Sequence, residues 1–159
     1  MTHAPDLEHL MTTIALADEA VTDGNHPFGA ILVAEDGTVL ATAKNNYQVD
    51  KGPGHAETNL ARQAAREFSV DVLRRATLYT SVEPCCMCAG SIYWAEIGTV
   101  VFGMTEKRLA ELTGDDPENP TQDLDCRTVF AAGRNTVEVR GPFPELEQAI
   151  VAQHRDFWK

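Results

Sequence analysis

Two short segments, each at the start of an expected helix, carry metal-ligating side chains and constrain the fold most strongly. The first is His55-Ala56-Glu57, and the second is the Cys85–Cys88 segment that follows Pro84. Residues at i and i+3 share one helix face, so the sulfur atoms of Cys85 and Cys88 can point at the same ion. A helix N-terminus also favours thiolate through its dipole and its free N–H groups. One ion bound by both segments requires the two helix starts to meet.

The donor set of one imidazole and two thiolates is typical of zinc. Three protein ligands leave the fourth tetrahedral position for water, which is the pattern of catalytic rather than structural zinc. We therefore expect one Zn²⁺ per chain, held by His55, Cys85 and Cys88. Zinc would lower the pKa of its water from 15.7 toward about 7. Glu57 would act as the general base and acid beside the metal without ligating it.

Each half of this pattern has other interpretations when it stands alone. A lone Cys-x-x-Cys is also found in redox pairs and structural zinc sites. A structural site needs a fourth ligand, and Cys126 does not lie in a paired motif. Cys86 points about 100° around the helix from Cys85, so we expect Cys86 and Cys126 to be small buried hydrophobes. Glu57 alone would also suit a carboxylate that stabilises a helix N-terminus.

Short apolar segments alternate with helical segments along the chain. Strands are expected at 29–34, 39–43, 77–81, 100–102 and 137–139, and helices at 6–23, 56–68, 84–95, 105–112 and from Pro144 onward. Loops are expected at 45–54 and 113–123, and Asp6 is expected to cap the first helix. This alternation predicts an α/β fold, a three-layer α/β/α sandwich with a five-stranded mixed sheet. The length of 159 residues fits one domain, 1–159.

The charge balance disfavours a nucleic-acid partner. The chain has 13 Lys and Arg against 24 Asp and Glu, a net charge of −11 and a pI of about 4.7. Nucleic-acid binding draws its affinity largely from basic side chains that neutralise phosphates. We therefore expect a small-molecule ligand. The sequence has no recognisable signal peptide and no apolar run of the roughly 18 residues that a membrane span needs, so we expect a cytoplasmic protein without a membrane partner.

Taken together, the two segments resemble the H-x-E…P-C-x-x-C signature of zinc nucleobase deaminases. The chain resembles the cytidine deaminase-like superfamily over almost its whole length. Among the branches it is most similar to bacterial guanine deaminase, through the segments 26–30 (His-Pro-Phe-Gly-Ala) and 91–95 (Ser-Ile-Tyr-Trp-Ala). This resemblance implies a cytidine deaminase-like fold and hydrolytic release of ammonia from an aminated ring. Because members of the family are commonly dimers, it also implies a homodimer.

The resemblance further implies residues that contact the substrate. Asn45 would hydrogen-bond the ring, and Asn46 stays open as an alternative. Phe28 and Trp94 would line an aromatic pocket for a flat base. The ordinary interpretation of the two aromatic residues is hydrophobic core, and that of Asn45 is a turn or a helix cap.

Two further features of the resemblance lie near the C-terminus. Asp115 and Asp116 occupy the position of an acidic pair that helps guanine deaminases to recognise their base. Phe157 and Trp158 resemble an aromatic tail that closes the pocket in relatives. Solvated loop charge is the alternative for the acidic pair, and packing of the last helix onto the domain is the alternative for the tail.

Three functions follow as hypotheses. The first is a zinc-dependent deaminase of a free base or analogue: guanine, isoguanine, cytosine, isocytosine or an s-triazine. The second is a tRNA adenosine deaminase, which shares the metal motifs but carries a basic C-terminal helix that is not evident after Pro144. The third is a non-catalytic, zinc-stabilised interaction domain, which would be expected to lack Glu57 or to add a ligand. One fold can host all of these ring specificities.

Overall fold

The computed structural model describes residues 4–158, and a five-stranded sheet forms the centre of the fold. Its strands are β1 (Gly29–Val33), β2 (Val39–Lys44), β3 (Thr77–Val82), β4 (Thr99–Met104) and β5 (Glu138–Arg140), in the order β2-β1-β3-β4-β5. Strand β1 is antiparallel to both β2 and β3, whereas β3, β4 and β5 run parallel. The five-stranded mixed sheet expected from the sequence is confirmed.

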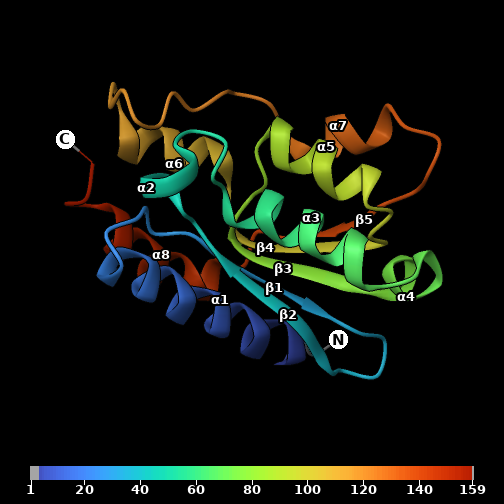
Figure 1. The fold of residues 1–159 in the computed structure, drawn as a ribbon. Coiled ribbons are helices and arrows are strands. Elements are labelled where there is room, and N and C mark those ends of the chain that lie inside the picture. The colour runs from blue at the N-terminus through green and yellow to red at the C-terminus, as the bar shows by residue number, and fades with distance from the viewer. Residues whose placement is uncertain (1–3, 159) are drawn as a thin grey trace.

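Helices cover both faces of this sheet (Figure 1). Helices α1 (Ala4–Thr22) and α8 (Pro144–His154) lie on one face, and α3 (Ala56–Glu67), α5 (Cys86–Trp94) and α7 (Cys126–Ala131) lie on the other. Helices α2 (Tyr47–Asp50) and α6 (Glu106–Thr113) lie at the end of the sheet where β3 and β4 finish, and α4 (Val70–Arg75) lies at the opposite end. The three-layer α/β/α architecture is therefore confirmed.

The central strands are buried on both faces. All of β1 and nearly all of β3 and β4 are buried, as expected for strands between two helical layers. Successive side chains point to opposite faces. Leu32 joins the core beneath α3 and α5, whereas Ile31 and Val33 join the core beneath α1.

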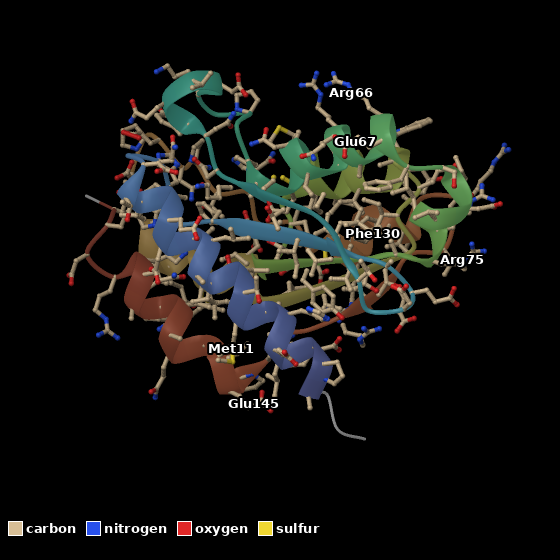
Figure 2. All side chains as sticks on the ribbon, turned by 60° about the horizontal axis from the view of Figure 1, so that its bottom comes forward. Met11, Arg66, Glu67, Arg75, Phe130 and Glu145 are labelled. Carbon is tan, nitrogen blue, oxygen red and sulfur yellow. The ribbon has the colours of Figure 1, made fainter. Side chains whose placement is uncertain are left out.

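Helix α1 begins earlier than expected, at Ala4, so that Asp6 lies inside its first turn and not before it. Asp6 is buried and accepts hydrogen bonds from Tyr79 Oη (2.8 Å) and from Arg140 Nε and Nη2 (2.8 and 3.0 Å). This network links α1 to β3 and β5. Met11, although apolar, is 59% exposed at the outer side of the layer formed by α1 and α8 (Figure 2). Thr13 is buried instead, because its hydroxyl donates to a main-chain carbonyl of the helix.

Three short helices lie outside the elements expected from the pattern. Helix α2 interrupts the predicted loop 45–54, and α4 and α7 stand between predicted elements. The side chain of Ser69 caps α4 by accepting from Val72 N, and that of Asp125 caps α7 by accepting from Arg127 N. Helices of four to six residues are too short for an apolar period to be visible. The caps were the only local signal for α4 and α7, and the Asn46 side chain does not cap α2.

No helix within residues 4–158 combines the length and the apolar character that crossing a membrane requires. The cytoplasmic location stays a prediction. The single domain 1–159 also stays a prediction, and its outermost positions, 1–3 and 159, lie outside the described residues.

Candidate active site

The starts of helices α3 and α5 meet above the carboxyl end of β3. His55 is the N-cap residue of α3 and Cys85 is the N-cap residue of α5, each with extended backbone angles. Cys88 lies in the first turn of α5, whereas Cys85 stands just before the helix. Gly54 fixes the approach to α3, because a β-carbon there would collide with Oδ1 of Asn46.

The three donor atoms fit one zinc ion. Nδ1 of His55 lies 3.5 Å from Sγ of Cys85 and 3.4 Å from Sγ of Cys88, and all three donor atoms lie within 4.8 Å of one another. Tetrahedral geometry with ordinary Zn–N and Zn–S bond lengths separates the two atom types by about 3.5 Å. The observed spacing is therefore that of a zinc site with three protein ligands.

The two thiols have different electrostatic surroundings. A hydrogen bond from the Cys88 thiol and the hydrogen bond and charge of His55 lower the pKa of Cys85 to about 4, against the opposing effect of burial. Burial raises the pKa of the deeper Cys88 thiol. The hydroxyl of Thr58 lies 3.3 Å from Sγ of Cys88 and donates to it. A bound cation would favour thiolate at both cysteines, since a coordinating thiol is deprotonated.

Glu57 lies directly beside this triad and is 4% exposed. Its Oε1 accepts a hydrogen bond from the Thr80 hydroxyl at 2.6 Å, and its Oε2 lies 3.5 Å from Sγ of Cys88. Burial raises the pKa of the Glu57 carboxyl, while His55 and the Thr80 hydroxyl oppose the rise. A carboxyl group with a raised pKa beside a metal site is suited to take up and release a proton.

The other two cysteines are not part of the triad. The Cys86 thiol donates to Oε1 of Gln122 at 2.7 Å. Cys126 is buried, and its backbone N–H donates to Oε2 of Glu83 at 2.9 Å. Oε1 of the same carboxylate accepts from the backbone N–H of Glu106 at 3.0 Å. Glu83 thus joins the first residue of α6 to the first residue of α7.

A small cavity of about 20 Å³ opens beside the triad. Its wall combines residues of the metal site with residues from the end of β3, from α6 and from the loop after it. The lining residues are Phe28, His55, Glu57, Val82, Glu83, Cys85, Glu106, Leu109 and Asn119. The ring of Phe28 lies nearly parallel to that of His55, with centroids 6.4 Å apart and an angle of 16° between the planes. The volume of this cavity is well below that of ordinary ligand pockets, which is about 300–1,000 Å³.

Glu106 is a second buried carboxyl group in this wall, at 6% exposure. Burial, with smaller contributions from Cys85, Glu57 and Glu83, raises the pKa of the Glu106 carboxyl to about 9. The sequence pattern did not single out Glu106, Asn119 or Thr80. None of them stands in a spacing motif, and the first two reach the cavity only because α6 and the following loop fold back onto β3.

Asn45 and Asn46 are in different situations. Oδ1 of Asn45 accepts from the backbone N–H groups of His26 (3.2 Å) and Tyr47 (2.9 Å), which leaves its amide N–H₂ group without a hydrogen bond inside residues 4–158. Asn46 uses both ends of its amide, donating to Asp50 and accepting from Asn59. The backbone of Asn45 also donates to the carbonyl of Phe28. Of the two asparagines, Asn45 is therefore the one with a free donor, but it lines the groove beside α3 and not the triad cavity.

Trp94 and the acidic pair lie outside the cavity of a single chain. Trp94, at the end of α5, is 82% exposed. Asp115 is exposed, and Oδ1 of Asp116 accepts from the backbone N–H of Glu118 in a turn at 2.9 Å. Neither aspartate lines the cavity. Residues 114–125 instead reach it through Asn119.

The C-terminal tail packs beside Phe28. The indole N–H of Trp158 donates to Nδ1 of His154 at 3.0 Å, and the two rings stack. Trp158 is 9% exposed, and Phe157 is half-buried and edge-on to His26. His26 is itself buried and pairs with Glu118 at 2.9 Å. His26 and His154 are therefore interior residues that join the tail to the loop after α6, not surface residues.

Known proteins share these features. A model of the cytidine and deoxycytidylate deaminase zinc-binding region matches residues 4–104, more than half of the chain. The probable cytosine deaminase of Schizosaccharomyces pombe is 35% identical over 156 residues, which cover 96% of this chain and 92% of the relative. A tRNA-specific adenosine deaminase of Haemophilus influenzae is 34% identical over 102 residues, covering 64% of this chain and 59% of the relative.

Guanine deaminase of Bacillus subtilis is similar in both sequence and structure. Its sequence is 38% identical over 109 residues, covering 67% of this chain and 69% of the relative. Its solved structure superimposes with a TM-score of 0.58 and 28% identity, covering 99% of this chain and 96% of that one. The matched region contains the triad and Glu57. The chain therefore belongs to the zinc-binding cytidine and deoxycytidylate deaminase family.

Proposed function

We propose that this protein is a hydrolytic deaminase of a free aminated nucleobase or a close analogue. One observation carries the proposal: Glu57, a buried carboxyl group beside three zinc ligands, lines a small cavity together with Phe28. A non-catalytic zinc domain has no need of an acid buried at the metal with a raised pKa. The small size of this cavity favours a compact ligand over a large one.

The residues of the cavity divide the chemistry between them. Zinc, when bound by His55, Cys85 and Cys88, supplies a Lewis acid that makes water nucleophilic at neutral pH. Glu57 accepts one proton of the attacking water and delivers it to the ring nitrogen, while the water oxygen bonds to the amino-bearing carbon. Glu57 then takes the remaining proton of that new hydroxyl group and passes it to the amino group, so that a C=O bond forms as the C–N bond breaks and ammonia leaves. Thr80 holds Oε1 of Glu57 in place throughout.

The substrate is a flat ring that binds by stacking and a few hydrogen bonds. Phe28 provides a ring face in the cavity wall. Asn45, whose backbone is bonded to that of Phe28, would add an amide donor if the ring reaches the adjoining groove. The relatives include cytosine and guanine deaminases. Guanine, isoguanine, cytosine, isocytosine and s-triazines all remain candidates. Trp158, buried against His26 and Phe28, leaves little room for a ribose.

A panel assay for ammonia release tests this proposal. The zinc-loaded protein is incubated with each candidate ring, with guanosine and cytidine, and with tRNA. We expect at least one free base to be turned over far better than its nucleoside. Comparable kcat/KM values for guanine and guanosine, or inosine in a tRNA anticodon, would contradict the proposal.

Deamination of adenosine in tRNA is the second candidate, favoured by the relatives that carry this activity. The groove beside Asn45 and α3 contains Arg62, Arg66 and Lys44 but also Asp23 and Glu67, and Arg66 and Glu67 project outward together from α3 (Figure 2). Lys44 is already paired with Asp23 at 2.8 Å. This mixed charge, with a net charge of −11, is a poor match for a polyanion. Binding to tRNA that falls steeply with salt would favour this candidate.

We also propose that the protein is a homodimer, which follows from the family resemblance and from one surface feature. Helix α5 exposes Trp94 (82%) and Met87 (36%), and large exposed aromatic side chains are enriched at subunit interfaces. Light scattering at micromolar concentration tests this. We expect twice the chain mass of 17.4 kDa, and a clean monomer would exclude the dimer.

A further inference from the structure

Glu106 is held in place by its backbone, while its side chain is left free. It is the first residue of α6, and its N–H donates to Oε1 of Glu83 at 3.0 Å. The side chain is 6% exposed and belongs to the cavity wall. Within residues 4–158 its carboxyl group makes no hydrogen bond and no ion pair. A ligand bound in the cavity could therefore donate a hydrogen bond to this carboxyl group.

A buried carboxyl group without a hydrogen-bond partner lowers the stability of the folded protein. Burying a polar group without a hydrogen bond destabilises the folded state, and buried polar groups in native proteins nearly always have partners. The neighbouring cavity residues Leu109, Val82 and Phe28 are apolar, so a leucine at position 106 would suit packing better. A residue that lowers stability in this way is typical of a binding site.

We propose that Glu106 is a specificity-determining residue whose carboxyl oxygen accepts a hydrogen bond from an N–H group of the substrate ring. This inference rests on the proposed deaminase function and deepens it. A carboxyl oxygen accepts from N–H in both protonation states. The substrate class is then an aminated ring that carries a second N–H besides the amino group that leaves, as cytosine and guanine do. The stacked ring of Phe28 would hold the base flat while Glu106 holds its edge.

The test combines a change in the protein with a change in the ring. Glu106→Leu removes the acceptor, and Glu106→Gln keeps a carbonyl oxygen at nearly the same place. Glu111→Gln, on the exposed side of the same helix, is the matched control. Each zinc-loaded protein is assayed with cytosine, 1-methylcytosine, guanine, 1-methylguanine and 9-methylguanine. Zinc content and the melting temperature are measured alongside.

We expect the wild-type protein to prefer its base to one N-methyl analogue by at least tenfold. That preference should collapse in Glu106→Leu, together with a loss of about 10- to 100-fold in kcat/KM that falls mainly on KM. Glu106→Gln should retain most of the preference, and Glu111→Gln all of it. The melting temperature of Glu106→Leu should stay the same or rise, with zinc content unchanged.

An unchanged N–H preference in Glu106→Leu would overturn the inference. A lower melting temperature in both Glu106 variants with an unchanged preference would likewise overturn it, since it would assign the residue a structural role. The proposed function is judged separately, on the wild-type protein. If the wild-type protein released no ammonia from any base, the proposed deamination of free bases would be wrong, whatever the variants showed.

Discussion

The metal side and the substrate side of the cavity are built in opposite ways. On the metal side, each ligand lies within three residues of the start of a regular helix, and the backbone of α3 and α5 positions all of them. On the substrate side, the wall comes from Phe28, from the start of α6 and from Asn119 in the loop after it. The difference shows that local rules fix the chemistry, while long-range packing fixes the shape of the site.

The two sides also differ in how their polar groups are satisfied. On the metal side, Thr58 and Thr80 donate to Cys88 and Glu57, so the reactive groups have partners before any substrate arrives. On the substrate side, the carboxyl group of Glu106 lacks a partner inside the described chain. Preorganised donors support catalysis, whereas groups left free support binding. Substitutions on the metal side should therefore reduce zinc content or kcat, whereas substitutions on the substrate side should mainly change KM and substrate preference.

The largest effect is expected from loss of a ligand on the metal side. Cys88→Ala should bind little zinc and show no measurable ammonia release. Because metal binding is coupled to folding, it should also be less stable than the zinc-loaded wild type. Metal analysis after dialysis and thermal unfolding measure both effects. Full zinc content in this variant would remove Cys88 from the triad, and Cys86→Ala should leave zinc content unchanged.

The next largest effect is expected from Glu57, which lies on the metal side but does not bind the metal. Glu57→Gln should keep zinc and the fold, because Gln retains the size of Glu and can still accept from Thr80. Without a proton acceptor, kcat should fall by about 10²–10⁴-fold or more. Steady-state kinetics with the best base of the panel, on protein of measured zinc content, test this. Near-normal turnover would exclude Glu57 as the proton carrier.

A smaller effect is expected at the residue that positions Glu57. Thr80→Val removes a hydroxyl that is 2.6 Å from Oε1 of Glu57 but keeps the side-chain shape. A hydrogen bond to a charged group contributes about 1.5–3 kcal/mol, so kcat should fall roughly 10- to 100-fold with little change in KM. Thr80→Ser should restore turnover. A rise in KM at constant kcat would instead assign Thr80 to substrate binding.

The smallest effect concerns the tail and appears as a dependence on pH. Burial lowers the pKa of His154 to about 4, whereas an unfolded histidine titrates near 6.5. Below pH 6.5 the unfolded chain binds a proton that the folded chain does not, so stability is present above 6.5 and is lost as pH falls toward 4. The contribution should drop by about 2 kcal/mol between pH 7 and pH 5.

Urea unfolding of the wild-type protein and of His154→Gln at these two pH values isolates this contribution, because other titrating groups are common to both proteins. The wild type should lose more stability than the variant on going from pH 7 to pH 5. Equal losses would mean that His154 is not the buried neutral group that ties Trp158 to the domain.

Several features of this protein were decided by the sequence alone. The spacing of His55, Glu57, Cys85 and Cys88 determined the zinc triad and the acid beside it, because each segment acts through one helix start. Continuous apolar runs with intervening helical periods determined the strands and the layer order. These are short-range properties, since a helix cap or a strand period involves only neighbouring residues.

The remaining features were decided only by tertiary structure. The pattern of the first helix did not reveal that Asp6 would be buried, because its partners Tyr79 and Arg140 lie on distant strands. Glu106 looked like an ordinary first-turn acid until α6 packed against the carboxyl end of β3. Trp94 lies outside the cavity of its own chain because α5 turns its C-terminal end to the surface. Burial and partnership depend on contacts between residues far apart in the chain, and a single sequence carries no local pattern for them.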